Sequence, residues 1–194
     1  MHNLAKIIVP NSVAIYNAYI AQLEDESLIE LVEFESSGLS FTLQNDGTYE
    51  VSALITSLTG EVVIPAYYNG VPVTRIGNYG FEDCIGITSI RIPSTVTAIG
   101  AYAFSGCSNL NNVVVPESVA SIGACAFSDC EGLYAMILMR TPDRGITLIN
   151  PTAFIGCQLG GIRVMDEESY EAYFAYYELR SEQIAEALIY IMYI

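Results

Sequence analysis

The sequence predicts an α/β solenoid, β-rich with short helical turns, in which one short unit is stacked on itself. Two observations predict this fold class: a Phe-x-x-Cys element returns at a nearly constant interval, and the residues between its copies alternate between apolar and polar. Phe81, Phe104 and Phe127 are 23 residues apart, and Phe154 follows after 27. Self-similarity with a period of about 20–50 residues indicates stacked repeats, which bury a continuous core only together.

Each repeat is expected to hold two short strands and one turn. Alternating runs such as Ile90–Ile92 and Val96–Ile99 predict the strands. Proline ends the first strand because it lacks a ladder donor, and glycine ends the second because it permits a sharp bend. Phe and Cys, three residues apart, predict a helical turn with both side chains inward. The other repeated positions are Ile76-Gly77, Ile99-Gly100, Ile122-Gly123, Pro93, Pro116, Cys84, Cys107, Cys130 and Cys157.

These residues resemble the BspA-like leucine-rich repeats, a family found mainly in bacterial surface and adhesion proteins. The family order I-x-I-P, V-x-x-I-G, A-F-x-x-C is carried by Ile90–Pro93, Val96–Gly100 and Ala103–Cys107, and it is repeated over residues 113–130. The resemblance covers residues 39–180 approximately and implies a right-handed leucine-rich-repeat solenoid. The departures from the family pattern are Gly80, Met165 and the longer third repeat at Thr141–Asn150.

The segments that flank the repeats are expected to cap them. Leu39–Leu54 holds two alternating runs around Asn45-Asp46-Gly47, which favours a hairpin because this turn needs positive φ. Ile162–Ile184 predicts a strand, a polar turn and a Tyr-rich helix. Lys6–Leu23 has the same order, with a strand at Ile7–Val9. It is either the end of a preceding module or a chance likeness between two ordinary amphipathic helices.

Three regions are therefore expected: an N-terminal segment over 1–38, the solenoid with its hairpin cap over 39–165, and a helical cap with an apolar tail over 166–194. The tail Ala187–Ile194 is too short to cross a bilayer. It is expected to pack on the preceding helix, to pair as an edge strand, or to dock against another copy or a partner.

The formal charge of −15 lies mainly outside the repeats. Residues 1–60 carry eight acids and one Lys (−7), residues 61–165 seven acids and five Arg (−2), and residues 166–194 seven acids and one Arg (−6). This sign and the absence of a basic stripe argue against nucleic-acid binding. Neither a secretory signal nor a spanning segment is recognisable. The resemblance implies a cell-surface or secreted location, and an intracellular or virion location is the alternative.

The sequence predicts no catalytic, metal or cofactor site. The four repeated cysteines should form a line rather than a tetrahedron, so we expect free, buried thiols that resist labelling. Cys125 aligns with Tyr79 and Tyr102 and is expected to be more exposed. The only histidine is His2, at the terminus, so no nucleophile has a histidine base within the folded body.

The predicted function is a non-enzymatic binding module, which the family resemblance directs to adhesion or recognition of a protein or glycan. Binding is expected on outward residues of the first strands, which change from polar to apolar along the stack: Ser89, Arg91, Asn112, Val114, Ala135 and Ile137. The same residues are also explained as ordinary strand surface. A second candidate surface is Tyr-rich, although helical spacing places some of its members in the core: Tyr170, Tyr173, Tyr176 and Tyr177. The alternative function is a structural or assembly component of a virion or intracellular complex, docking through its caps and apolar tail.

Overall fold

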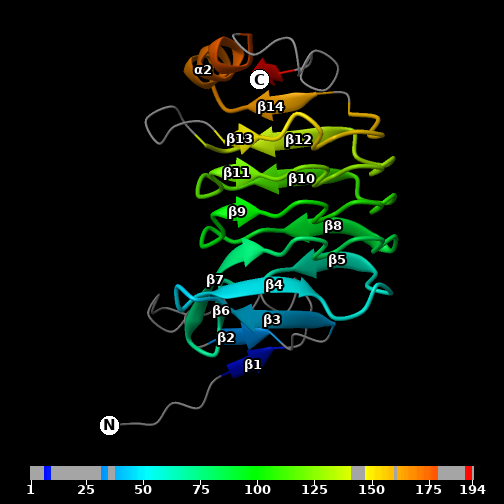
Figure 1. The fold of residues 1–194 in the computed structure, drawn as a ribbon, viewed down its shortest axis with the longest axis vertical. Coiled ribbons are helices and arrows are strands. Elements are labelled where there is room, and N and C mark those ends of the chain that lie inside the picture. Colours follow the sequence, from blue (N-terminus) through cyan, green and yellow to red (C-terminus); the bar gives the residue numbers. More distant parts are fainter. Residues whose placement is uncertain are drawn as a thin grey trace.

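A computed structural model shows a β-solenoid of about four turns (Figure 1). The structure describes residues 7–9, 32–34, 38–140, 147–159, 161–178 and 191–193. Each complete repeat, here called a rung, gives one strand to each of two sheets that run along the stack. The predicted β-rich repeat architecture is confirmed.

The strands of each sheet are joined rung to rung in parallel, with antiparallel pairs at β3–β4 and β6–β7. The six-stranded sheet has the order β15-β14-β12-β10-β8-β5: Gly60–Val63 (β5), Ile87–Arg91 (β8), Asn112–Val115 (β10), Ala135–Leu138 (β12), Ile162–Val164 (β14) and Ile191–Tyr193 (β15). The seven-stranded sheet has the order β13-β11-β9-β7-β4-β3, with β6 on β7: Leu39–Leu43 (β3), Tyr49–Ala53 (β4), Tyr67–Tyr68 (β6), Val71–Ile76 (β7), Ala98–Ile99 (β9), Ser121–Ile122 (β11) and Leu148–Ile149 (β13). The remaining elements are β1 (Ile7–Val9), β2 (Val32–Phe34) and α2 (Glu167–Glu178).

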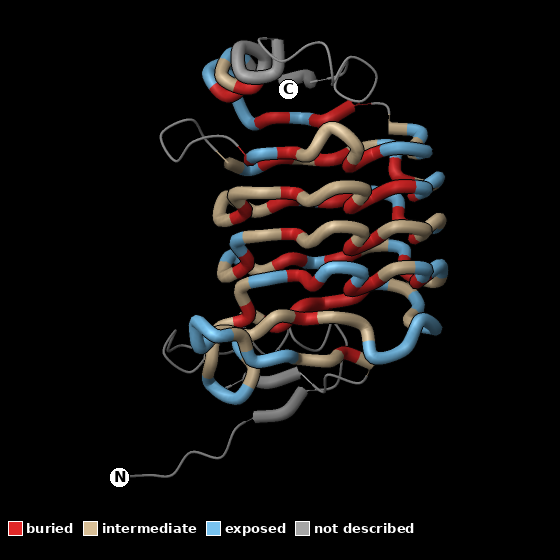
Figure 2. Tube along the Cα trace, viewed as in Figure 1, coloured by how far each residue is buried: buried red, intermediate tan, exposed pale blue. Residues whose placement is uncertain are grey.

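The core is a set of ladders in which identical side chains stack from rung to rung. The rings of Phe81, Phe104, Phe127 and Phe154 have successive centroid distances of 5.2, 5.2 and 5.7 Å and are nearly parallel. Figure 2 shows the buried segments recurring at each level of the stack. Because each ring covers the face of the next, a single rung leaves much of its apolar surface in water, and only stacking buries it.

The repeated cysteines form the expected ladder of free thiols. Cys84, Cys107 and Cys130 are fully buried, and Cys157 is half-buried. The thiol of Cys107 donates to the carbonyl of Phe81 in the preceding rung, with 3.1 Å between sulfur and oxygen. Burial raises the pKa of Cys84 to about 11 and the pKa of Cys107 to about 12. These thiols act as core side chains that also join rungs.

The helical turns predicted around Phe-x-x-Cys are wrong. These segments form tight turns in which Tyr79 and Asp83 have φ of 57° and 56°, and Tyr102 has φ of 56°. Such values interrupt a right-handed helix. Alternate amides point along the solenoid instead: the N–H of Phe81 donates to the carbonyl of Ala103 in the next rung, over 2.7 Å. Among the described residues α2 is the one helix, so the fold is a β-solenoid rather than α/β.

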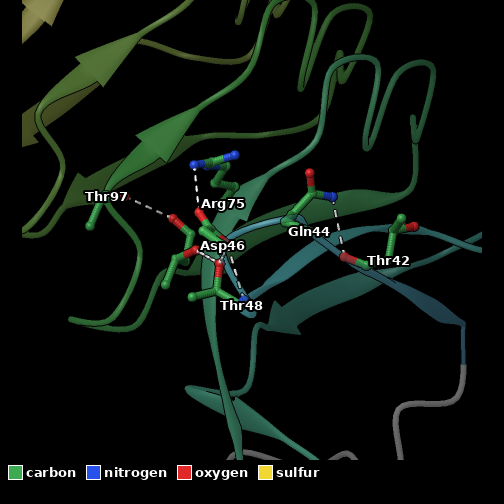
Figure 3. A network of polar contacts seen from close by, with 7 residues as sticks. Thr42, Gln44, Asp46, Thr48, Arg75 and Thr97 are labelled. Carbon is green, nitrogen blue, oxygen red and sulfur yellow. Dashed lines mark hydrogen bonds and ion pairs between the residues drawn. The ribbon is translucent and has the colours of Figure 1, made fainter.

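The predicted hairpin is confirmed as β3 and β4, and β4 pairs in parallel with β7 of the first rung. A polar network fastens its turn to that rung (Figure 3). The Asp46 carboxylate accepts hydrogen bonds from Thr48 and from Arg75, with 2.8 Å to the guanidinium. The hydroxyls of Thr48 and Thr74 share a hydrogen bond of 2.6 Å. The hydrogen bonds that Thr48 donates to the Asp46 carboxylate, and then the charge of Arg75, lower the pKa of Asp46.

Both ends of the chain hold a parallel strand pair, but only β15 extends a sheet of the solenoid, whereas β1 and β2 form a separate two-stranded sheet. At one end β15 pairs in parallel with β14, with Ile162 opposite Ile191. At the other end β1 pairs in parallel with β2, with Ile7 opposite Val32. The strand predicted at Ile7–Val9 is confirmed, and the helix predicted after it lies outside the described residues. Of the three arrangements expected for the tail, Ile191–Tyr193 adopts the edge strand.

Candidate ligand-binding face

The outward side chains of the six-stranded sheet form rows, because the strands are parallel and in register. One row places Ser89 beside Glu61 and Asn112, and Asn112 beside Ala135. Two residues further along the strands, Val114 lies beside Ile137, and Ile137 beside Arg163. Since Ser89 is opposite Asn112 and Ile90 opposite Val113, Arg91 lies beside Val114 in this second row, and its other neighbour is Val63.

A hollow of about 510 Å³ opens on this face over β8 and β10. Its size is within the range of small-molecule and side-chain binding pockets. The residues that line it come from four successive strands and their ends: Glu61, Ser89, Ile90, Arg91, Ile92, Asn112, Val114, Pro116, Glu117 and Met139.

On the polar side of the hollow, several side-chain hydrogen-bonding groups are not used within the fold. The Arg91 guanidinium meets the Glu61 carboxylate at 3.4 Å, with 49% and 37% of the two side chains exposed. This long, single contact leaves most of the five N–H donors of the arginine unused. The side chains of Ser89 and Asn112 make no hydrogen bond to other described residues, so both are available to solvent or a ligand.

The apolar side of the hollow lies toward the ends of the strands. Val114 is 45% exposed and Met139 is 36% exposed, and Pro116, in the same row as Met139, is half-buried. Exposed apolar surface beside unused polar groups is the composition expected of a binding pocket. Arg140, next to Met139, donates to the carbonyl of Glu117 over 3.1 Å and so tethers the rim.

Of the six residues predicted for binding, Ser89, Arg91, Asn112 and Val114 line the hollow. Ala135 and Ile137 lie on the adjacent strand β12, half-buried and outside it. The other six lining residues were not predicted from the sequence: Glu61, Ile90, Ile92, Pro116, Glu117 and Met139. Repeat alignment contains the missing signal, since Met139 occupies the position held by Pro93 and Pro116 in the preceding rungs.

Tyr173, one of the four tyrosines of the second candidate surface, does not lie on the surface. This side chain is fully buried, its hydroxyl accepts a hydrogen bond from the Thr147 amide over 2.8 Å, and burial raises its pKa. The predicted alternative for such residues, a core position, holds for Tyr173. The side chains of Tyr170, Tyr176 and Tyr177 lie outside the described set.

The turns carry a second aromatic column at their surface. Tyr79 and Tyr102 stack with centroids 5.0 Å apart and planes 7° apart. Cys125 follows in the same column and is half-buried. It is therefore more exposed than the fully buried Cys84, Cys107 and Cys130, as expected from the sequence.

Within the residues that the structure describes, no three or more His, Cys, Asp or Glu side chains are grouped to hold a metal ion. The helix in the same residues is not long and apolar enough to cross a membrane.

The stacked rungs, the inward ladders and the outward sheet face define a leucine-rich-repeat solenoid. The chain belongs to the BspA type leucine rich repeat family, whose model matches residues 61–188 in 6 copies. A comparison with curated proteins finds no match.

Solved bacterial proteins share this fold. The chain is similar to a leucine-rich repeat protein from Bacteroides capillosus at 23% identity and a TM-score of 0.54, covering 68% of this chain and 97% of that one. It is also similar to a leucine rich cell surface protein from Faecalibacterium prausnitzii, at 22% identity and a TM-score of 0.56, covering 96% of this chain and 47% of that one. The chain thus spans about half the length of the second protein. At these identities the likeness shows the fold alone.

Proposed function

We propose that the chain is a non-enzymatic binding module that recognises a protein or glycan through the hollow on its six-stranded sheet. The observation that carries this proposal is the meeting of unused polar groups and exposed apolar side chains over β8 and β10. The right-handed, capped solenoid implied by the family is the scaffold for this role.

The sheet face suits recognition because the stack does not depend on it. Parallel pairing between rungs satisfies the backbone, and the Phe, Ile and Cys ladders supply the buried surface. Outward residues can therefore differ from rung to rung at little cost in stability. Ser89, Asn112 and Ala135 occupy one such row, with three different chemistries.

A non-catalytic role is supported by the chemistry of the face. The hollow has no cysteine and no histidine in its lining, and the Glu61 carboxylate is engaged by Arg91. A nucleophile with an adjacent base, the arrangement required for covalent catalysis, is not formed by the residues of the hollow.

A cell-surface or secreted location is part of the proposal. It is supported by family membership and by the similar fold of a leucine rich cell surface protein. The alternative, an assembly component that docks through its apolar tail, has less support because Ile191–Tyr193 already pair with β14 within the chain.

The test is a binding screen of the folded chain against immobilised extracellular-matrix proteins and a glycan array. Val114→Asp should abolish the binding of any true ligand, because it puts a charge into the apolar side of the hollow. The matched control is Leu148→Asp on the seven-stranded sheet, where the leucine is 49% exposed against 45% for Val114.

Ligands that bind the Leu148→Asp variant but not the Val114→Asp variant would support the proposal. Ligands that bind both variants equally would place recognition elsewhere. Binding to no matrix protein or glycan, together with tight binding of a partner from the protein's own cell, would favour the assembly role.

A further inference from the structure

The arginines of this acidic chain are unevenly placed. Four arginine side chains lie in the described residues, and Arg91 and Arg163 both point outward from the six-stranded sheet. Arg140 lies at the rim of the same face, whereas Arg75 is on the other sheet and is paired with Asp46. This face therefore carries three of the four described arginines, beside the carboxylates of Glu61 and Glu117.

Arg91 and Arg163 are the two arginines of one row, which continues to Val63 beyond Arg91 and to Met192 beyond Arg163. Between them, in register, lie Val114 and Ile137. Neighbouring parallel strands are about 4.8 Å apart, so three intervals place the two arginine Cα atoms about 14 Å from each other. Arg91 has its single long contact to Glu61, and Arg163 has no ion pair with any described residue.

The floor between the arginines is aliphatic. Val114 is exposed, Ile137 is half-buried, and Met139 continues the apolar surface beyond them. No aromatic side chain lines the hollow. A sugar ring would lack an aromatic face to stack on, whereas an aliphatic side chain would find surface of its own kind.

An extended peptide lying across the strands matches these spacings. Its residues i, i+2 and i+4 point to one side, and residues i and i+4 are about 13 Å apart at about 3.3 Å per residue. Carboxylates at i and i+4 would reach the two arginines, and an aliphatic residue at i+2 would fall between Val114 and Ile137.

We propose that the occupant of this face is an extended protein segment of the form acid-x-aliphatic-x-acid, held by Arg91 and Arg163 over the Val114–Ile137 floor. The inference rests on the proposed function, since it names the ligand class of the same face. Each contact is a solvent-exposed ion pair, so binding should be modest and should weaken with salt.

The probe is a fluorescein-labelled peptide containing Glu-Ser-Leu-Ser-Glu between flexible Gly-Ser ends, titrated into the full chain by fluorescence polarisation at low ionic strength. Two control peptides carry Glu-Glu-Leu-Ser-Ser, which has the same composition with the wrong acid spacing, and Lys-Ser-Leu-Ser-Lys. The expected Kd for the probe is at least about fivefold lower than for either control, the ratio given by one surface ion pair of about 1 kcal/mol.

Arg163→Glu should raise the Kd of the probe about tenfold, since a repulsion replaces an attraction. Arg75→Glu is the control: it makes the same charge change at an exposed arginine on the other sheet, one that is ion-paired with Asp46, and it should leave the Kd within about twofold. Circular dichroism establishes that both variants are folded.

Equal binding of the three peptides, or no effect of Arg163→Glu, would overturn the inference. The proposed function fails separately. If a glycan or a folded protein bound in a way that Val114→Asp abolished while the probe did not bind, the face would still be a recognition site and only its ligand class would be wrong. If no ligand responded to Val114→Asp, the recognition site itself would be disproved.

Discussion

The Phe-x-x-Cys column and the outward face of the six-stranded sheet belong to the same rungs but follow opposite rules. The column repeats its residues with little change, and its Phe rings stack at 5.2 to 5.7 Å. The face changes at every rung, from Ser89 to Asn112 to Ala135. Stacking requires the same residue type at each buried position, because each side chain packs against its counterpart in the next rung. The outward positions have no such requirement and can vary to form a specific binding surface.

Phe104→Ala is the strongest way to break the stack. The ring is fully buried between Phe81 and Phe127, so its removal should leave a cavity and lower the free energy of unfolding by about 3–5 kcal/mol. Urea denaturation followed by circular dichroism measures the loss. Val114→Ala, on the exposed face, should cost less than about 1 kcal/mol. Equal losses at the two positions would remove the distinction between column and face.

Thiol labelling sharpens the comparison within the column. In the folded chain at pH 8, Cys125 should react with a disulfide reagent at least about 100-fold faster than Cys84 or Cys107, because burial and pKa values of about 11 and about 12 leave few thiolates. Mass spectrometry of the labelled peptides gives the order. Full labelling in urea is the control, and early native labelling of Cys107 would show that the ladder is open to solvent.

Gly106→Ala tests the fit between successive turns. Gly106 has φ of 74°, and the Asp83 carboxylate of the preceding rung lies where a Cβ would be. We expect a loss of about 1–3 kcal/mol in the free energy of unfolding, measured by urea denaturation. Adding Asp83→Gly should restore part of it, because glycine removes the carboxylate and accepts the φ of 56° at that position. A double variant no more stable than Gly106→Ala would refute the contact.

The smallest effect is expected from acid at the hairpin turn. The pKa of Asp46 is lowered in the folded chain by hydrogen bonds from Thr48 and by the charge of Arg75. The stabilisation of the folded state by this carboxylate is therefore fully present above the ordinary aspartate pKa of about 3.9 and is lost as the pH falls through the lower folded value. The melting temperature of Asp46→Asn should therefore be slightly below that of the parent chain at pH 6, and the two should converge as the pH falls through the lowered pKa of Asp46. A gap that persisted in acid would assign the effect to geometry instead.

The inward half of the molecule was readable from the sequence because it is periodic. The recurrence of Phe, Cys and Ile-Gly at 23 residues identifies the buried positions, the strands and the family, and Asn45-Asp46-Gly47 identifies the hairpin. Helical turns were the error. Phe and Cys three residues apart suit a helical turn, yet the amides of Tyr79, Phe81 and Asp83 donate to the next rung. A partner 22 residues away is invisible to local spacing.

The candidate site was half readable. Alternation identified Ser89, Arg91, Asn112 and Val114 as outward, but it could not decide where the surface is hollow. Glu61 enters through the register between β5 and β8, and Met139 enters because it replaces the proline of the earlier rungs. The pairing of β1 with β2 and of β14 with β15 likewise joins segments that are distant in the sequence.

The sequence by itself determined that this chain is a stacked repeat, which residues face inward and that the cysteines of Phe-x-x-Cys are core thiols, because those properties are set by periodicity and polarity within one rung. Only the tertiary structure decided that the turns are not helical, that Tyr173 is core rather than surface, and that Arg91 and Arg163 stand in one row across four strands. Each of these depends on register between rungs, which is fixed by hydrogen bonds and packing that no single repeat contains.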